Sequence, residues 1–145
     1  MKIVLHQANF RSFFGLICSF YTRSQWSHAS IVTDEAWWDT TFSRGYFDHR
    51  KVEPNRNVLV FDLPDISGEE WCKAKRGTKY DRAGLLLYPF DLHTEGKEFC
   101  YETVVDFLRA HGIKVAVGRA SPKKILDALE GYHFRYCKEG EISGL

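Results

Sequence analysis

The chain has 145 residues, with 20 Lys and Arg against 19 Asp and Glu and a formal net charge of +1. Hydrophobic residues make up 44% and aromatic residues 15% of the chain, which excludes a disordered protein. The balanced charge argues against a nucleic-acid partner or a polybasic membrane anchor, and no apolar run is long enough for a transmembrane segment. At this length we expect a single domain spanning residues 1–145.

The N-terminus and the cysteine pattern indicate a cytoplasmic protein without a cofactor or metal. The first residues lack the unbroken apolar region of a signal peptide, because His6, Gln7 and Arg11 interrupt it. The cysteines form no C-x-x-C pair and no metal-ligand spacing with the histidines. We therefore expect reduced thiols, of which three are structural. These three are Cys18, Cys72 and Cys137.

In chain order, the hydrophobic pattern predicts short strands followed by amphipathic helices. Strands are predicted at 2–6, 27–33, 36–42, 57–62 and 132–136, and helices at 10–21, from Ser67 onwards, and at 80–88, 98–111 and 121–129. Strands and helices neither alternate strictly nor segregate. The predicted fold class is therefore α+β, a small antiparallel sheet packed with helices.

The strands at 27–33 and 36–42 are predicted to form a hairpin that contains a candidate base. A two-residue turn at Asp34 and Glu35 sets the register. In that register, Asp39 lies diagonally beside His28 on the same face of the sheet. A shift by one residue would place Thr40 there instead. Histidine is the usual base for a cysteine nucleophile, and a third polar group orients its ring.

Cys100 is the candidate nucleophile, in the first turn of the helix at 98–111. It shares one helical face with Val104, Phe107 and Leu108, so the thiol points inward. The positive end of the helix dipole lowers the pKa of a thiol there and favours the reactive thiolate. The alternative is a packed core thiol.

Three short motifs follow one another along the chain: SHASIV at 27–32, GTKYD at 77–81 and FCYET at 99–103. This set resembles the circularly permuted branch of NlpC-type papain-like thiol hydrolases, in which the His strand precedes the Cys helix. YiiX-like and lecithin–retinol acyltransferase-like proteins belong to that branch, and similar small open frames are common in phage genomes. The resemblance spans residues 10–111 and implies a permuted papain-like fold. It assigns Cys100 as nucleophile and His28 as base, with Asp39 or Thr40 as the third polar residue.

Two tyrosines bear on this resemblance. The resemblance places Tyr80, in the GTKYD motif, near the site as a hydroxyl donor, and the alternative is that Tyr80 is a core aromatic residue. Tyr101 stands where relatives commonly have a small serine after the nucleophile, and it could crowd the substrate entrance.

The function implied by the resemblance is a cysteine peptidase or amidase-like hydrolase that cleaves an amide bond in a peptide or cell-wall peptide. Two alternatives remain. One is an acyltransferase or lipid esterase that uses the same Cys–His pair on an acyl substrate. The other is a non-catalytic binding module, such as a phage protein that grips a host protein. A phage enzyme would act in the host cytoplasm or be delivered in a virion.

Overall fold

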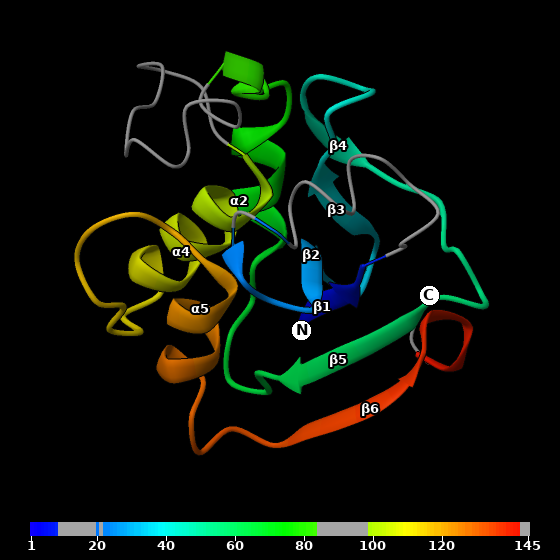
Figure 1. Ribbon diagram of the computed structural model, residues 1–145, viewed down its shortest axis with the longest axis vertical. Coiled ribbons are helices and arrows are strands. Elements are labelled where there is room, and N and C mark those ends of the chain that lie inside the picture. The colour runs from blue at the N-terminus through cyan, green and yellow to red at the C-terminus, as the bar shows by residue number, and fades with distance from the viewer. Residues whose placement is uncertain (9–19, 21, 84–98, 143–145) are drawn as a thin grey trace.

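The computed structural model describes residues 1–8, 20, 22–83 and 99–142. Within these ranges the chain forms six strands, three α-helices and a short 3-10 turn (Figure 1), which confirms the α+β class. The elements are β1 (Lys2–Gln7), β2 (Trp26–Val32), β3 (Trp37–Thr40), β4 (Phe47–His49), β5 (Asn57–Asp62), α2 (Glu69–Lys75), α4 (Cys100–Ala110), α5 (Pro122–Ala128), β6 (Phe134–Lys138) and η2 (Glu139–Glu141).

The six strands form one antiparallel sheet in the order β4-β3-β2-β1-β5-β6. The β2–β3 hairpin pairs Ile31 with Trp38 and Val32 with Trp37. That register is the one predicted from the two-residue turn. A bulge interrupts the β1–β2 pairing, where Gln7 pairs with Trp26 directly after His6 pairs with His28.

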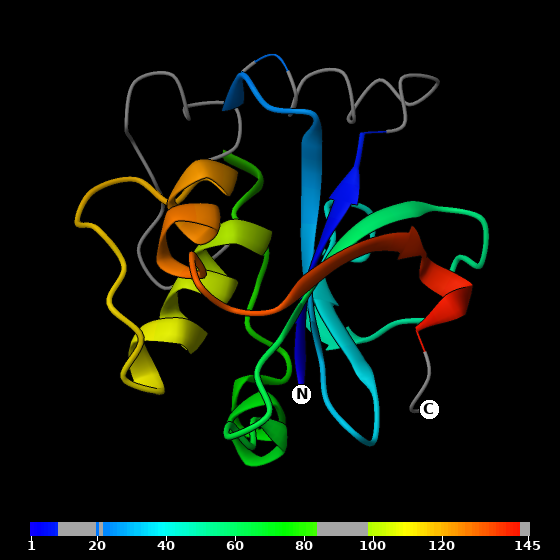
Figure 2. The ribbon, with the colours of Figure 1, turned by 90° about the horizontal axis from the view of Figure 1, so that it is seen from below.

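Side chains alternate along each strand and divide the sheet into two faces. The helix face carries residues such as Leu5, Ala29 and Ile31, which pack into one core with the helices. The opposite face carries a smaller apolar cluster of Val4, Val32, Trp37, Val58 and Val60. Figure 2 shows α2, α4 and α5 on one side of the sheet and η2 on the other.

The helix α4 has the predicted inward face. Cys100 is 5% exposed, and Val104, Phe107 and Leu108 are no more than 1% exposed. The helix ends before Gly112, whose φ of +80° suits glycine at this position. None of the helices in the described part of the chain is long and apolar enough to cross a bilayer.

Several predicted boundaries were wrong. Gly68 caps α2 instead of Ser67, and β3 ends at Thr40, because the chain turns back through a bond from the Gly45 N–H to the Thr41 carbonyl. The last strand lies at 134–138 instead of 132–136, and β4 was not predicted, because FDH has no apolar alternation. Almost all of the predicted helix at 10–21, including Cys18, and most of that at 80–88 lie outside the described residues.

Candidate active site

Three neighbouring strands place polar side chains together on the opposite face of the sheet. The β1–β2 register puts His6 directly across from His28, and their ring centroids lie 5.1 Å apart. The β2–β3 register extends to place Ser30 across from Asp39. Residues paired across an antiparallel sheet point to the same face. The four side chains therefore form one cluster beside the Val4 and Val32 side chains.

Within this cluster His28 is hydrogen-bonded to Asp39. The His28 Nε2 lies 2.7 Å from Asp39 Oδ2, and the two side chains are 13% and 1% exposed. Asp39 Oδ1 also accepts a bond of 2.7 Å from Arg44. No hydrogen bond among the described residues uses the other ring nitrogen of His28, Nδ1. The pair therefore has the geometry of a base held by an acid, with one nitrogen left for a proton.

The Asp39 carboxylate is stabilised in its charged form despite its burial. Burial alone opposes ionisation, but the charge of His28 and the hydrogen bonds from His28 and Arg44 hold the pKa of Asp39 well below its ordinary value. The guanidinium of Arg50, with Nε 3.4 Å from Asp39 Oδ2, adds to this effect. Asp39 is therefore a permanent negative charge at neutral pH.

A second chain of contacts links Ser30, His6 and Glu139. His6 Nε2 lies 2.7 Å from Ser30 Oγ, and His6 Nδ1 lies 3.2 Å from Glu139 Oε2. This Ser–His–Glu order has the composition of a catalytic triad. However, none of the three residues is more than 1% exposed, so a substrate has no access to the hydroxyl. We interpret the three as a structural network.

Burial keeps His6 neutral. Desolvation lowers the pKa of His6 well below the ordinary value of 6.5. The nearby positive charges of His28, Arg56 and Arg50 lower it further. Asp39 has the opposite effect but is outweighed.

Arg50 joins the two chains of contacts into one network. Its Nη2 lies 2.7 Å from Glu139 Oε1, its Nε faces Asp39, and its guanidinium lies over the Trp37 ring, 5.3 Å from the centroid. The backbone N–H of Glu53 also donates to Glu139 Oε1, at 2.6 Å. Sequence analysis missed these partners. His6 could have been found by extending the β2 register to β1, but no local pattern identifies Arg50 or Glu139.

Cys100 lies in a different layer from His28. It is the first residue of α4, where the Phe99 N–H donates to Glu102 Oε2 at 3.0 Å, and it belongs to the helix-face core. The His28 ring points to the opposite face of the sheet. The structure therefore brings His28 to Asp39, whereas it places the Cys100 thiol on the side of β2 that faces the helices.

One contact ties the first turn of α4 to the start of β2. The Tyr101 hydroxyl donates a hydrogen bond of 2.9 Å to the carbonyl of Trp26, two residues before His28. Tyr101 is 2% exposed, so its side chain is a core anchor. Cys100 and His28 thus lie near the same end of β2, although on opposite faces.

This anchor gives a prediction. In Tyr101→Phe the Trp26 carbonyl loses its donor inside the core, so the free energy of unfolding should fall by about 1–3 kcal/mol. The same change at Tyr46, which is 42% exposed, is the control and should cost less than about 0.5 kcal/mol. Urea unfolding of both variants measures the difference. Equal effects would show that the Tyr101 hydrogen bond contributes nothing to stability.

The other predicted site residues lie on the helix face. Thr40 pairs with Phe47 and is 1% exposed, so it points away from His28, and the ring has Asp39 as its partner. Tyr80 is 7% exposed in the helix-face core, where its ring meets Phe42 edge to face at 5.9 Å.

The remaining described cysteines are free thiols. Burial, with a smaller effect of Glu69, raises the pKa of Cys72 to about 12, so this thiol is unreactive at neutral pH. Cys137 is half-buried on β6. No group of three His, Cys, Asp or Glu side chains within the described ranges has a metal-binding arrangement.

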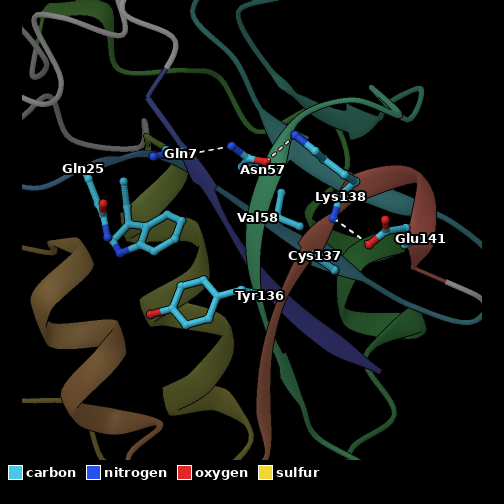
Figure 3. A pocket seen from close by; sticks show the side chains of 9 residues that line it. Gln7, Gln25, Asn57, Val58, Tyr136, Cys137, Lys138 and Glu141 are labelled. Carbon is cyan, nitrogen blue, oxygen red and sulfur yellow. Dashed lines mark hydrogen bonds between the residues drawn. The ribbon is translucent and has the colours of Figure 1, made fainter.

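A cavity of about 440 Å³ lies at the end of β2 beside β5 and β6. Figure 3 shows its polar rim, in which Asn57 donates to Gln7 and Lys138 donates to Asn57. Tyr136 projects into the view from β6, and its ring stacks on Trp26 with centroids 6.1 Å apart. The cavity therefore adjoins the strand end where Tyr101 is anchored.

The three motifs occupy defined places in the fold. SHASIV lies in β2, GTKYD follows α2 and leads to the buried Asp81, and FCYET holds the cap and first turn of α4. The likeness to permuted papain-like enzymes rests on these motifs alone. Comparison with protein families, curated proteins and solved structures finds no match for this chain.

Proposed function

We propose that this chain is a cysteine hydrolase with a permuted papain-like fold that cleaves an amide bond in a peptide. The observation that carries the proposal is the 2.7 Å hydrogen bond between His28 Nε2 and Asp39 Oδ2. The strand that holds His28 comes earlier in the chain than the helix that begins at Cys100. The bond orients the ring and leaves Nδ1 to act as the base. The helix start favours the thiolate form of Cys100.

In the proposed reaction, the Cys100 thiol gives its proton to His28 Nδ1, and the thiolate forms a C–S bond with the amide carbonyl carbon. Backbone N–H groups at the start of α4 stabilise the oxyanion. The C–N bond then breaks, and the leaving amine takes the proton from His28. Water attacks the thioester and passes a proton to His28, which returns it to the sulfur as the acid product leaves.

The anchored turn of α4 supports the encounter of the two groups. The Tyr101–Trp26 bond holds the residue after Cys100 within two residues of His28 along β2. The bulge in β2 lies between Trp26 and His28, and a bulge is a common way to redirect a side chain beside an active site. The two side chains lie on opposite faces of the sheet, so the proposed proton transfer requires one of them to move around this end of β2.

The pH dependence of thiol labelling tests the proposal. We expect iodoacetamide to modify Cys100 rapidly below the ordinary thiol pKa of about 8.5, since His28 accepts the thiol proton. His28→Ala should slow this labelling at pH 7 by at least about tenfold. Mass spectrometry of the modified peptides gives the rate at each cysteine, and Cys72 is an internal standard for a slow thiol.

His133→Ala is the matched control, because His133 also contacts a carboxylate, Asp62 at 3.0 Å, but is exposed and lies just before β6. This variant should label like the wild type. Labelling of Cys100 that is as slow as that of Cys72, or that is unchanged in His28→Ala, would overturn the proposal.

A non-catalytic binding module is the second candidate, and one observation favours it. His28 lies on the opposite face of the sheet from α4, joined to the buried network through Asp39. A histidine whose only role is to pair with Asp39 would leave Cys100 an ordinary core thiol. In that case, the labelling experiment would give slow, His28-independent modification of Cys100.

A further inference from the structure

The strand β6 is an edge of the sheet, and no strand in the described part of the chain pairs with its outer side. The Glu139 N–H bonds the Arg56 carbonyl and the Asp62 N–H bonds the His133 carbonyl, so the odd-numbered residues of β6 face β5. By the alternation of an antiparallel ladder, the N–H and C=O groups of Phe134 and Tyr136 point outward. None of the contacts among the described residues satisfies these four groups.

The side chains at the same positions are exposed aromatics. Phe134 is 56% and Tyr136 is 67% exposed, and their rings meet edge to face at 6.2 Å. In Figure 1, β6 is the outermost strand on its side of the sheet. Natural edge strands commonly carry prolines, bulges or inward-pointing charges that block pairing. β6 has neither proline nor bulge, its lysine stands at the last position, and the two residues whose backbone groups point outward are aromatic.

We infer that β6 binds an extended peptide as an added strand, with the N–H and C=O groups of Phe134 and Tyr136 forming the new ladder. Apolar side chains of the peptide pack beside the two aromatic rings. The inference rests on the proposed function only in taking this peptide as the substrate, because the pairing itself does not need the thiol.

The charges on β6 favour a peptide with carboxylates over a second copy of the chain. Antiparallel pairing of β6 with its own copy, Phe134 across from Tyr136, would set Arg135 against the same arginine, and like charges across a ladder are destabilising. Lys138 adds another cation to the strand. Acidic residues in the peptide that alternate with apolar ones would instead face Arg135.

The bound peptide would pass close to the candidate active site. Tyr136 stacks on Trp26, whose carbonyl holds Tyr101 next to Cys100. The 440 Å³ cavity opens between these aromatic residues and the polar rim seen in Figure 3, where Gln25 projects from the start of β2. This cavity is the place for a polar side chain of the peptide.

The test uses the whole chain as Cys100→Ala, which removes any turnover, and the synthetic peptide Thr-Phe-Asp-Phe-Asp-Thr with a fluorescein label. We expect a Kd of about 1 mM or tighter by fluorescence polarisation. Amide exchange by NMR gives the geometry. The outward N–H groups of Phe134 and Tyr136 should exchange rapidly in the free protein and at least about tenfold more slowly with peptide. The Arg135 and Cys137 amides, already paired with β5, should change little.

Two variants distinguish the contribution of the Tyr136 backbone N–H to peptide binding from that of its ring. Tyr136→Pro removes an outward N–H without touching the ladder to β5, and should abolish binding, whereas Tyr136→Ser keeps the donor and should only weaken it. Urea unfolding confirms that both fold. Equal binding by Tyr136→Pro and the wild type, protection of all β6 amides alike, or no binding would overturn the inference. If the peptide binds but the Cys100 thiol of the wild type is unreactive, the proposed hydrolase function is wrong and the inference about β6 stands.

Discussion

Replacing Glu139 by alanine should lower the free energy of unfolding by about 3–5 kcal/mol. The carboxylate is fully buried and contacts Arg50 Nη2 at 2.7 Å, the Glu53 N–H at 2.6 Å and His6 Nδ1 at 3.2 Å. Without Glu139, Arg50 keeps only the more distant carboxylates of Asp39 and Glu53, each at 3.4 Å, and losing one partner of a buried ion pair costs far more than the pair itself contributes. Arg50 is 7% exposed, so water cannot replace the lost carboxylate.

Urea unfolding measures this loss, with Glu130→Ala as the matched control. Glu130 is exposed just after α5, so its replacement should change stability by less than about 0.5 kcal/mol. The double variant Glu139→Ala, Arg50→Ala should cost less than the sum of the single variants, by about 0.5–3 kcal/mol, because it also removes the arginine that has lost its shortest contact. Strictly additive losses, or a Glu139→Ala variant as stable as the control, would contradict a stabilising network.

The β2–β3 hairpin shows how much of the site can be predicted from residues close together in the sequence. A two-residue turn at Asp34 and Glu35 determines the pairing of the two strands, and the observed register agrees with it. That register alone predicted the meeting of His28 and Asp39, which lie 2.7 Å apart. The prediction succeeded because only eleven residues separate the partners and the pleat determines which side chains share a face.

The sequence could not determine which face of the sheet the helices cover. Both faces of β2 are apolar enough to be buried, since Ala29 and Ile31 lie on one and Val32 on the other. The amphipathic pattern of α4 predicted that Cys100 points inward, and this is observed. Whether inward meant towards His28 depended on long-range packing, which no spacing along the chain encodes.

The buried network was missed for a similar reason. Glu139 belongs to η2 near the C-terminus, and Arg50 follows β4, a strand too short to show alternation. In the sequence each looks like an ordinary surface charge. They are buried because β6 brings η2 back across β1, beside His6. Long-range pairs of this kind are visible only after the strand order is known.

Lowering the pH below about 6.5 should destabilise the protein through His6. The native state holds the pKa of His6 well below its ordinary value of 6.5, chiefly because the ring is buried, so the unfolded chain binds a proton that the native chain excludes. The stability that depends on neutral His6 is thus complete above the ordinary pKa and is lost as the pH falls from there towards the native pKa. Asp39 has a lowered carboxyl pKa, so its contribution is lost in a more acidic window, below its ordinary value of 3.8.

The expected slope in the His6 window is up to about 1.4 kcal/mol per pH unit for the uptake of one proton on unfolding. Urea unfolding between pH 4.5 and 7, a range taken from the histidine pKa of about 6.5 and the carboxyl values of about 4, measures it. His6→Asn should flatten the curve by that amount, because asparagine does not titrate, whereas the exposed His133→Asn should leave it unchanged. An unaltered slope in His6→Asn would mean that another group takes up the proton.

His6 faces the cations Arg50 and Arg56 and the ring of His28, together with two carboxylates, Asp39 and Glu139. These carboxylates already balance the positive charge of the arginines, so a proton on the His6 ring adds a positive charge without a counter-ion. Acid should therefore loosen the contact between β1 and η2 first, while the helix-face core around α4 remains packed.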